Sequence, residues 1–279
     1  MRPRCLALAL LLVPGAASAS NWALELSGGL AALPDEGSQP FVSAMLSRQM
    51  GAVQLRGGVA WYGGDDEADP ADLLPAETWQ ATVGAGFVTG PVLVDVYASV
   101  GRRRFDPVVR DLRNNQVIRF EAEGGLFTLG GSLTLDTPVA PGWTAAPFVS
   151  LSYSALDTAR TIVPPAGAPL IDERTEKGVT GTAGLSVARD WGGGSLGVYL
   201  AGAATSNRAS VDRQGSAVLA ARVPRLPGDE DGGDAWLEYG LSGSMALSET
   251  MSLDAAVTRT LGFADGETTS VSAGVRIAF

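Results

Sequence analysis

Apolar and polar residues alternate with a period of two along most of the chain. Near the amino end Trp22, Leu24 and Leu26 fall on one face of an extended chain, and Glu25 and Ser27 fall on the other. The same alternation runs through residues 78–88 and 271–279. Because successive side chains of a strand point to opposite faces, this pattern predicts β-strands and not helices.

The alternation divides the chain into a dozen segments of strand length. The predicted strands cover residues 21–33, 39–49, 51–62, 77–89, 91–105, 119–136, 142–156, 177–190, 194–207, 234–247, 250–262 and 267–279. So many short strands, separated by turn residues and without an intervening helical pattern, predict an all-β fold, either a barrel or a sandwich.

The lengths of the connections favour the barrel. Tight turns follow the second, fourth, eighth and tenth predicted strands. The turn after the sixth strand, residues 137–141, is only slightly longer. The connections after the third, fifth, seventh and ninth strands are long and rich in Pro, Gly and charge. Outer-membrane barrels alternate short periplasmic turns with longer external loops. We therefore predict a closed antiparallel transmembrane β-barrel of twelve strands with both ends on the periplasmic side; a secreted soluble β-sandwich is the alternative.

The composition agrees with a barrel. Apolar residues make up 46% of the chain and the mean hydropathy is +0.15, yet the formal net charge is −10. No apolar run reaches the roughly 20 residues that a transmembrane helix needs. A closed barrel crosses a bilayer without such a run because its backbone hydrogen bonds are all satisfied between strands.

The first residues have the organisation of a secretory signal. Arg2 and Arg4 precede an apolar run from Leu6 to Val13, and the small residues Ala17-Ser18-Ala19 follow. We expect residues 1–19 to be a signal peptide and residues 20–279 to form one outer-membrane barrel domain. Export to a Gram-negative bacterial outer membrane is the expected localisation.

Aromatic residues near the strand ends fit a membrane barrel. Such barrels carry aromatic girdles where the strands meet the two interfaces. The candidates, all on the apolar faces of their strands, are Trp22, Trp61, Trp79, Trp143, Tyr239 and Phe279. In a soluble protein the same residues would instead cap an apolar core.

Two short stretches resemble autotransporter translocator barrels. The last strand alternates and stops at Phe279, as in the carboxyl-terminal signature that outer-membrane barrels present to their assembly machinery. The stretch GWTAAPFVSLSYS resembles the turn and strand near the middle of the autotransporter barrel, on the matching residues Gly142, Trp143, Pro147, Phe148 and Tyr153. The resemblance implies a twelve-stranded barrel. Because the first strand begins about two residues after the expected cleavage, we expect no secreted passenger, and a translocation function is not implied.

Charged residues on the polar faces predict a lumenal charge cluster. Closing the barrel pairs the last strand with the first and the eleventh, which brings Arg276 beside Glu25 and Asp254, and we predict an ion-pair cluster there. Arg56 and Asp95 are predicted to form a second group across the lumen. Such pairs either neutralise and fill a narrow interior or contribute to solute selectivity.

Further charges fall near the predicted external rim. Arg102 and Arg104 extend the apolar face of the fifth strand to the level of lipopolysaccharide phosphates, which arginine can bind in a bidentate manner; plain solvation is the alternative. Two external loops are acidic, with Asp65, Asp66, Glu67, Asp69, Asp72, Asp229, Glu230, Asp231 and Asp234. We expect these loops to be solvated, since their spacing does not match a helix-loop-helix calcium site.

The residue types exclude most catalytic chemistry. The chain has no histidine, and its one cysteine, Cys5, lies in the expected signal. Ser195 sits in a tight turn without a base, Gly84 and Gly86 precede no helix, and Lys177 follows no phosphate-binding loop. We expect no enzyme, no cofactor and no bound metal, and the acidic balance disfavours nucleic acid.

The sequence therefore predicts an integral barrel that serves as a small passive channel or supports envelope integrity. The alternative is a surface adhesion or interaction protein with a plugged lumen and functional external loops. The expected partners are outer-membrane lipid, lipopolysaccharide and the barrel assembly machinery, and a monomer is favoured.

Overall fold

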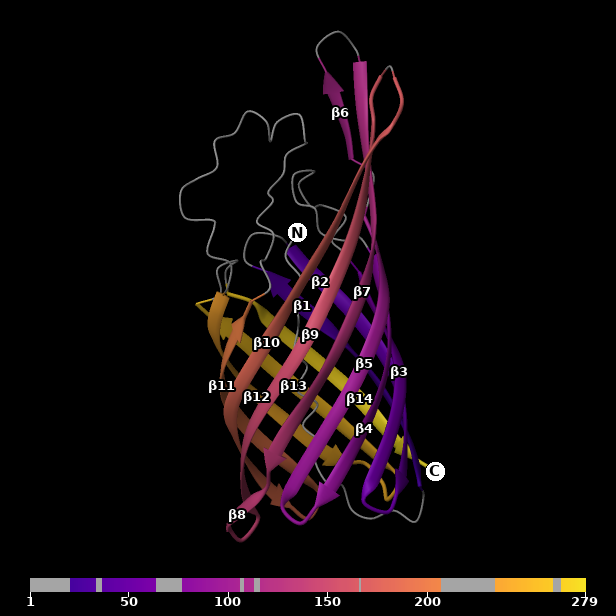
Figure 1. The fold of residues 1–279 in the computed structure, drawn as a ribbon. Coiled ribbons are helices and arrows are strands. Elements are labelled where there is room, and N and C mark those ends of the chain that lie inside the picture. The colour runs from indigo at the N-terminus through magenta and orange to yellow at the C-terminus, as the bar shows by residue number, and fades with distance from the viewer. Residues whose placement is uncertain are drawn as a thin grey trace.

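The fold is a closed, tall barrel of antiparallel strands (Figure 1). The computed structural model describes residues 21–33, 37–63, 77–105, 108–112, 116–165, 167–206, 234–262 and 267–279. Every regular element in these ranges is a strand. The described residues contain no helix of the length and apolar character needed to cross a membrane.

Twelve strands make the wall. Going round the ring they are β1 (Trp22–Leu33), β2 (Gly37–Met50), β3 (Val53–Gly63), β4 (Glu77–Thr89), β5 (Val92–Arg104), β7 (Gln116–Leu135), β9 (Trp143–Val163), β10 (Leu170–Trp191), β11 (Gly194–Thr205), β12 (Asp234–Ala246), β13 (Met251–Leu261) and β14 (Thr269–Ala278). Each strand pairs with the next in sequence order within this set, and β14 pairs with β1 to close the ring. The predicted twelve-stranded closed barrel is confirmed.

Two short strands lie outside this ring and were not predicted. β6 (Val108–Leu112) pairs with the start of β7, and β8 (Thr137–Ala140) pairs with the start of β9. The β6–β7 hairpin stands above one end of the barrel, and β8 lies at the other end (Figure 1). Both fall in segments that we assigned to connections, because they lack the apolar face that marks a strand in contact with lipid.

The same reason explains an error in two strand boundaries. The seventh and eighth strands were predicted to end at 156 and begin at 177, but β9 continues to Val163 and β10 begins at Leu170. Their register runs without interruption from Leu170↔Ile162 to Arg189↔Trp143. The outer part of this ribbon is polar and rich in Thr, so it keeps the β-propensity but loses the alternation of a lipid-facing strand.

The apolar face of each strand points outward. Val83, Leu151 and Val257 are exposed, whereas Ser99 and Ser154, on the alternate positions, are buried. In water such an exterior would be a large apolar patch, but on a closed barrel it is the surface that contacts lipid. The predicted orientation of the fifth strand is confirmed, since Val96 and Val100 are outward and Ser99 is inward.

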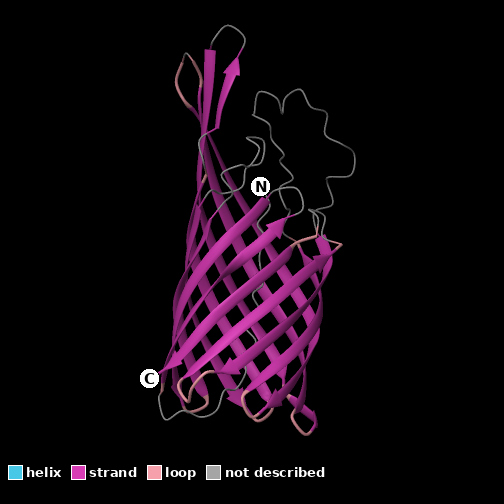
Figure 2. Ribbon diagram, turned by 180° about the vertical axis from the view of Figure 1, so that it is seen from behind, coloured by secondary structure: helices cyan, strands magenta, loops and turns pink. Residues whose placement is uncertain are grey.

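The described turns that follow β2, β4, β8, β10 and β12 lie at one end of the barrel (Figure 2). Gly51, Gly90 and Gly142 adopt positive φ there, with values of 64°, 59° and 73°, a region that glycine reaches without steric cost. The carboxyl end lies at the same level, where the Phe279 backbone N–H donates to the Trp22 carbonyl at 3.0 Å. We call this the turn end, and the opposite one the loop end.

Some of the predictions fall outside the described residues. The expected signal peptide lies in residues 1–20, and the acidic residues 65–72 and 229–231 lie in two further undescribed segments. Of Asp234 only the backbone position, as the first residue of β12, is described.

Candidate functional site: the lumenal wall

The inward positions of the strands are dominated by small and hydroxyl-bearing residues. On β9 and β10 the inward side chains include Ser150, Ser152 and Ser154 on one strand and Thr180, Thr182 and Ser186 on the other. Gly and Ala occupy many of the remaining inward sites. The interior of an eight-stranded barrel is just filled by side chains, and the diameter grows with the number of strands. A ring of twelve strands therefore encloses a wider space than side chains alone would fill. Small side chains on the wall therefore take up little of the space that the ring encloses.

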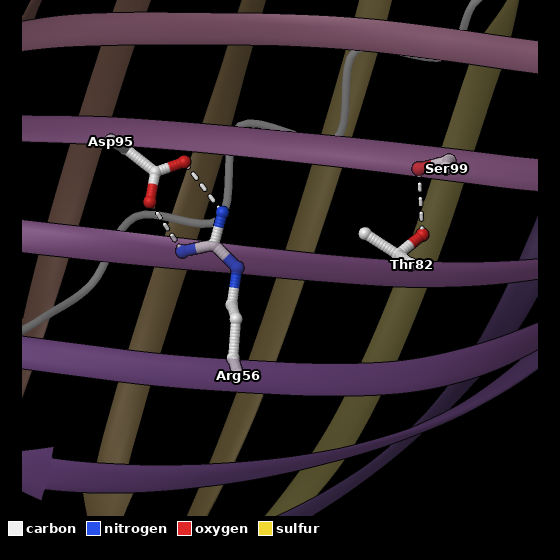
Figure 3. A network of polar contacts seen from close by, with 4 residues as sticks. All are labelled: Arg56, Thr82, Asp95 and Ser99. Carbon is white, nitrogen blue, oxygen red and sulfur yellow. Dashed lines mark hydrogen bonds and ion pairs between the residues drawn. The ribbon is translucent and has the colours of Figure 1, made fainter.

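Hydroxyl groups pair across neighbouring strands of this wall. Thr82 and Ser99 lie 2.8 Å apart between β4 and β5 (Figure 3), and Ser27 and Ser43 lie 2.6 Å apart between β1 and β2. Thr180–Thr205 and Thr258–Ser270 make equivalent pairs elsewhere in the ring. Each pair occupies directly opposed register positions, so the hydroxyls satisfy one another and give the lumen a continuous polar surface.

Five large inward side chains lie over glycines of the adjacent strand. Register places Gly29 opposite Phe41, Gly84 opposite Arg56, Gly130 opposite Tyr97, Gly184 opposite Phe148 and Gly240 opposite Tyr199. A Cβ built on Gly184 would lie 2.7 Å from the Phe148 ring, and one on Gly130 would lie 2.7 Å from the Tyr97 ring. Bulky side chains therefore lie flat along the wall instead of projecting into the lumen.

Arg56 and Asp95 form a bidentate ion pair on this wall. The two guanidinium nitrogens Nη1 and Nη2 each donate to one carboxylate oxygen, both at 2.5 Å (Figure 3). Both side chains are only 13% exposed. This planar two-bond geometry is the strongest form of an arginine–carboxylate contact. It fixes both charges and cancels them locally.

The prediction that this pair crosses the lumen is wrong. Arg56 is on β3 and Asp95 on β5, so the pair bridges the single strand β4 and stays on one side of the barrel. Gly84 and Gly86 of β4 leave the space for it: a Cβ on Gly84 would lie 3.0 Å from Arg56 Nε, and one on Gly86 would lie 3.6 Å from Asp95 Oδ1. Gly84 and Gly86 thus form the surface on which the ion pair lies.

The second charged group surrounds Glu25. Its register partner on β14 is Arg276, and Asp254 on β13 is a near neighbour of both through Ser252↔Arg276. Glu25 lies within electrostatic range of Asp254, Arg276 and Arg56. Among the described residues Arg276 makes no ion pair within 4.0 Å with either acid, so the prediction of an ion-pair cluster is wrong: the three residues are neighbours, but their charged groups do not meet. The three side chains are therefore neighbouring half-buried charges near the turn end, with unbalanced negative charge.

A third polar contact in the lumen was not anticipated. The Tyr199 hydroxyl on β11 donates to Glu238 Oε1 on β12 at 2.5 Å. Sequence alternation assigns both residues to the inward face. Their contact is diagonal, however, since the register pairs are Tyr199↔Gly240 and Ala201↔Glu238. Their contact depends on the register between β11 and β12, which the sequence alone does not specify.

The predicted girdle residues fall into two groups along the barrel. Trp22, Trp143 and Phe279 are at the turn end, and Trp61, Trp79 and Tyr239 are toward the loop end. Trp61 and Trp79 are register partners, and both indole N–H groups donate to Glu77 Oε1, at 3.1 and 2.7 Å. An outward indole that keeps a polar partner is suited to the boundary between hydrocarbon and headgroups.

The remaining predicted residues occupy the following places. Arg102 and Arg104 are exposed at the loop end of β5, and Arg102 pairs with Glu123 at 2.6 Å with both side chains more than half exposed. Ser195 is the second residue of β11, not part of the turn, and is buried on the inward face. Lys177 is exposed on the projecting part of β10. In the described part of the chain no three acids, cysteines or histidines gather as a metal site would require.

A closed antiparallel ring with an apolar exterior, a polar interior and tight turns at one end defines an outer-membrane β-barrel. Comparison of the sequence with known protein families identifies the family within this class. A profile of the family described as "Autotransporter beta-domain" matches residues 47–258, so the chain belongs to the autotransporter β-domain family, and the predicted resemblance is confirmed. No curated protein sequence is significantly similar to the chain.

Solved structures of this class share the fold. The translocator domain of the autotransporter NalP from Neisseria meningitidis is 13% identical with a TM-score of 0.63, over 92% of this chain and 87% of that one. The β-domain of the Bordetella autotransporter BrkA is 13% identical with a TM-score of 0.61, over 94% of this chain and all of that one. LpxR from Salmonella typhimurium is more distant, at 10% identity and a TM-score of 0.53, over 92% of this chain and all of that one.

Proposed function

We propose that this barrel is a passive channel for small polar solutes and ions. The observation that carries the proposal is the composition of the inward wall, where Ser, Thr, Gly and Ala predominate and five of the large side chains lie along the strands over glycines. A lumen meant to be filled would need large side chains pointing to its axis. Hydroxyl groups on the wall replace part of a solute's hydration shell, which lowers the barrier to entry.

The charges near the turn end would make this channel prefer cations. Arg56 and Asp95 cancel each other in their ion pair. Glu25 and Asp254 then face the single positive charge of Arg276, which leaves an excess of one negative charge at this level of the lumen. Fixed charge of one sign along a narrow pore raises the local concentration of the opposite ion.

Planar-bilayer recording under a salt gradient tests both parts of the proposal. Wild-type protein should give discrete conductance steps and a reversal potential on the cation-selective side. Arg276→Ala should move the reversal potential further in that direction, because it removes the positive charge. Arg48→Ala is the matched control: it removes an arginine from the outward face at the same end and should leave the reversal potential unchanged. Absence of conductance, or the same shift in both variants, would contradict the proposal.

One observation favours a second function, that of a surface interaction protein. The β6–β7 hairpin and the outer part of the β9–β10 ribbon extend well beyond the wall at the loop end (Figure 1). A paired ribbon outside the membrane adds nothing to a channel, and exposed strands can bind a partner by edge pairing. Retained conductance together with loss of cell-surface attachment, on removing the hairpin, would support this function beside the first.

We further propose that lipopolysaccharide contacts the loop end through Arg102 and Arg104. Glu123 already compensates Arg102, so Arg104 would contribute the larger share of phosphate binding. The Arg102→Ala/Arg104→Ala variant should carry less lipopolysaccharide through purification than wild type. An unchanged amount, measured per folded barrel, would count against the contact.

We also propose that the barrel assembly machinery recognises β14 and the terminal Phe279 side chain, which is 60% exposed. Export would use residues 1–19 as a signal peptide. A monomeric barrel without enzymatic activity is consistent with the residue types on the lumenal wall.

A further inference from the structure

Two outward arginines at the turn end lie against tryptophan rings. The Arg48 guanidinium carbon is 5.1 Å from the centroid of the Trp22 ring, and that of Arg189 is 5.6 Å from the Trp143 ring. These distances are within the range of a cation–π contact, about 6 Å. In both cases the arginine and the tryptophan are direct register partners on adjacent strands.

The two pairs repeat the same local design. Trp22 and Trp143 are the first residues of β1 and β9. Arg48 and Arg189 both lie two residues before the end of the neighbouring strand, and the strands end in the outward side chains of Met50 and Trp191, which are 42% and 53% exposed. Each site therefore combines a stacked cation with a lipid-facing apolar anchor at the same level.

The two pairs also face in opposite directions. In the ring of twelve wall strands β1 and β2 are first and second, and β9 and β10 are seventh and eighth. Four strands lie between the two pairs on either side of the ring, so the pairs are half a ring apart. A barrel held at these two places is held on opposite sides at one depth.

Outward arginines at the loop end are partnered differently. Arg102 pairs with Glu123, and Arg259 pairs with Glu267. Arg48 and Arg189 have no carboxylate within ion-pair distance among the described residues, and each stacks on an aromatic face instead. Carboxylates therefore compensate Arg102 and Arg259 at the loop end, whereas none compensates Arg48 or Arg189 at the turn end.

The chemistry of a stacked guanidinium indicates what would compensate it. Stacking on a ring uses the face of the guanidinium and leaves its N–H edge available, and that edge matches the two oxygens of a phosphate. The short turns of an outer-membrane barrel face the periplasm, so these edges lie at the headgroup level of the periplasmic leaflet. The anionic groups at that level are phospholipid phosphodiesters.

We propose that Arg48 with Trp22 and Arg189 with Trp143 are two phospholipid-binding sites, each taking the phosphodiester of one lipid of the periplasmic leaflet. The acyl chains of each bound lipid lie along the apolar exterior beside the tryptophan. The two sites fix the depth and tilt of the barrel in the bilayer, independently of whether the lumen conducts.

Native mass spectrometry of the refolded, detergent-solubilised protein with added phosphatidylglycerol tests the proposal. Wild type should retain lipid tightly, and Arg48→Gln/Arg189→Gln should bind it at least about tenfold more weakly per site, the factor expected for a lost charge-assisted hydrogen bond. Each single variant should lose one of two tightly bound lipids. Arg119→Gln/Arg259→Gln is the matched control and should bind as wild type does, because Arg119 pairs with Glu121 and Arg259 with Glu267.

Three results would overturn the proposal. They are equal lipid retention by wild type and the Arg48→Gln/Arg189→Gln variant, an equal loss in the control variant, or displacement of the lipid by an equal concentration of inorganic phosphate, which would make the sites general anion sites. Heat-modifiable gel mobility verifies that every variant has folded, so a loss of lipid cannot be attributed to an unfolded chain.

Discussion

At the scale of single residues, the wall depends on where side chains are missing. A glycine opposite each of five large inward residues lets those residues lie flat, and the Gly84–Gly86 pair makes room for an ion pair to pass over a strand. Sequence alternation identifies the inward face of every one of these residues. It does not reveal which glycine meets which side chain, because that depends on the register between strands, and a shift of one residue would exchange the two faces.

Gly184→Ala tests this use of glycine. A Cβ there would lie 2.6 Å from the Leu200 carbonyl oxygen as well as 2.7 Å from the Phe148 ring, so both backbone and side chain must move. We expect a loss of about 1–3 kcal/mol in the free energy of unfolding, as for other overpacked sites, measured by urea denaturation in lipid vesicles. Gly202→Ala is the control, since its Cβ would meet only the Leu237 side chain at 4.0 Å; a similar loss in both variants would contradict the explanation.

The Arg56–Asp95 pair predicts a measurable coupling. Removing either partner leaves a largely buried charge without compensation, so a double-mutant cycle with Arg56→Met and Asp95→Asn should give a coupling free energy of about 1–3 kcal/mol. The exposed Arg102–Glu123 pair provides the comparison, with an expected coupling below about 1 kcal/mol because water and salt screen it. Equal couplings would show that burial on the lumenal wall has no effect on the pair.

At the scale of elements, the chain combines a membrane wall with paired strands that extend beyond it. The twelve wall strands were predictable because contact with lipid on one side and a polar lumen on the other imposes strict alternation. Alternation could not predict four other parts of the sheet, because both of their faces meet water and no apolar period marks them. These parts are β6, β8 and the outer parts of β9 and β10. The Phe105 backbone N–H donates to the Ala122 carbonyl oxygen at 3.1 Å, so the strands β5 and β7 are already paired at this level, below the β6–β7 hairpin.

Removal of the β6–β7 hairpin tests whether that part is separable. Replacing residues 107–120 by Asn-Gly, a two-residue hairpin turn, should leave the barrel folded because the Phe105–Ala122 bond brings the two strands together. We expect heat-modifiable mobility and single-channel conductance to stay as in wild type. A chain that fails to fold would show that the hairpin contributes to assembly of the wall.

At the scale of the whole molecule, the account combines a lipid-facing exterior, a polar interior and two different rims. At the loop-end rim Arg102 and Arg259 have carboxylate partners, whereas the turn-end rim offers two uncompensated arginines, Arg48 and Arg189, on opposite sides of the barrel. The sequence analysis did not single out these arginines, because their stacking on Trp22 and Trp143 depends on the register and their opposition depends on ring closure. The lumenal excess of negative charge likewise follows from β14 lying between β1 and β13.

The most direct test of these two faces is labelling of single cysteines with a membrane-impermeant maleimide in intact outer-membrane vesicles. The only native cysteine, Cys5, can be replaced by serine, so each introduced thiol is unique. Ser132→Cys and Ser272→Cys, on inward positions of β7 and β14, should react, whereas Leu133→Cys and Val271→Cys, their outward neighbours, should not. Labelling of the outward thiols, or of none of the inward ones, would contradict a barrel with a lipid-facing exterior and a water-filled lumen.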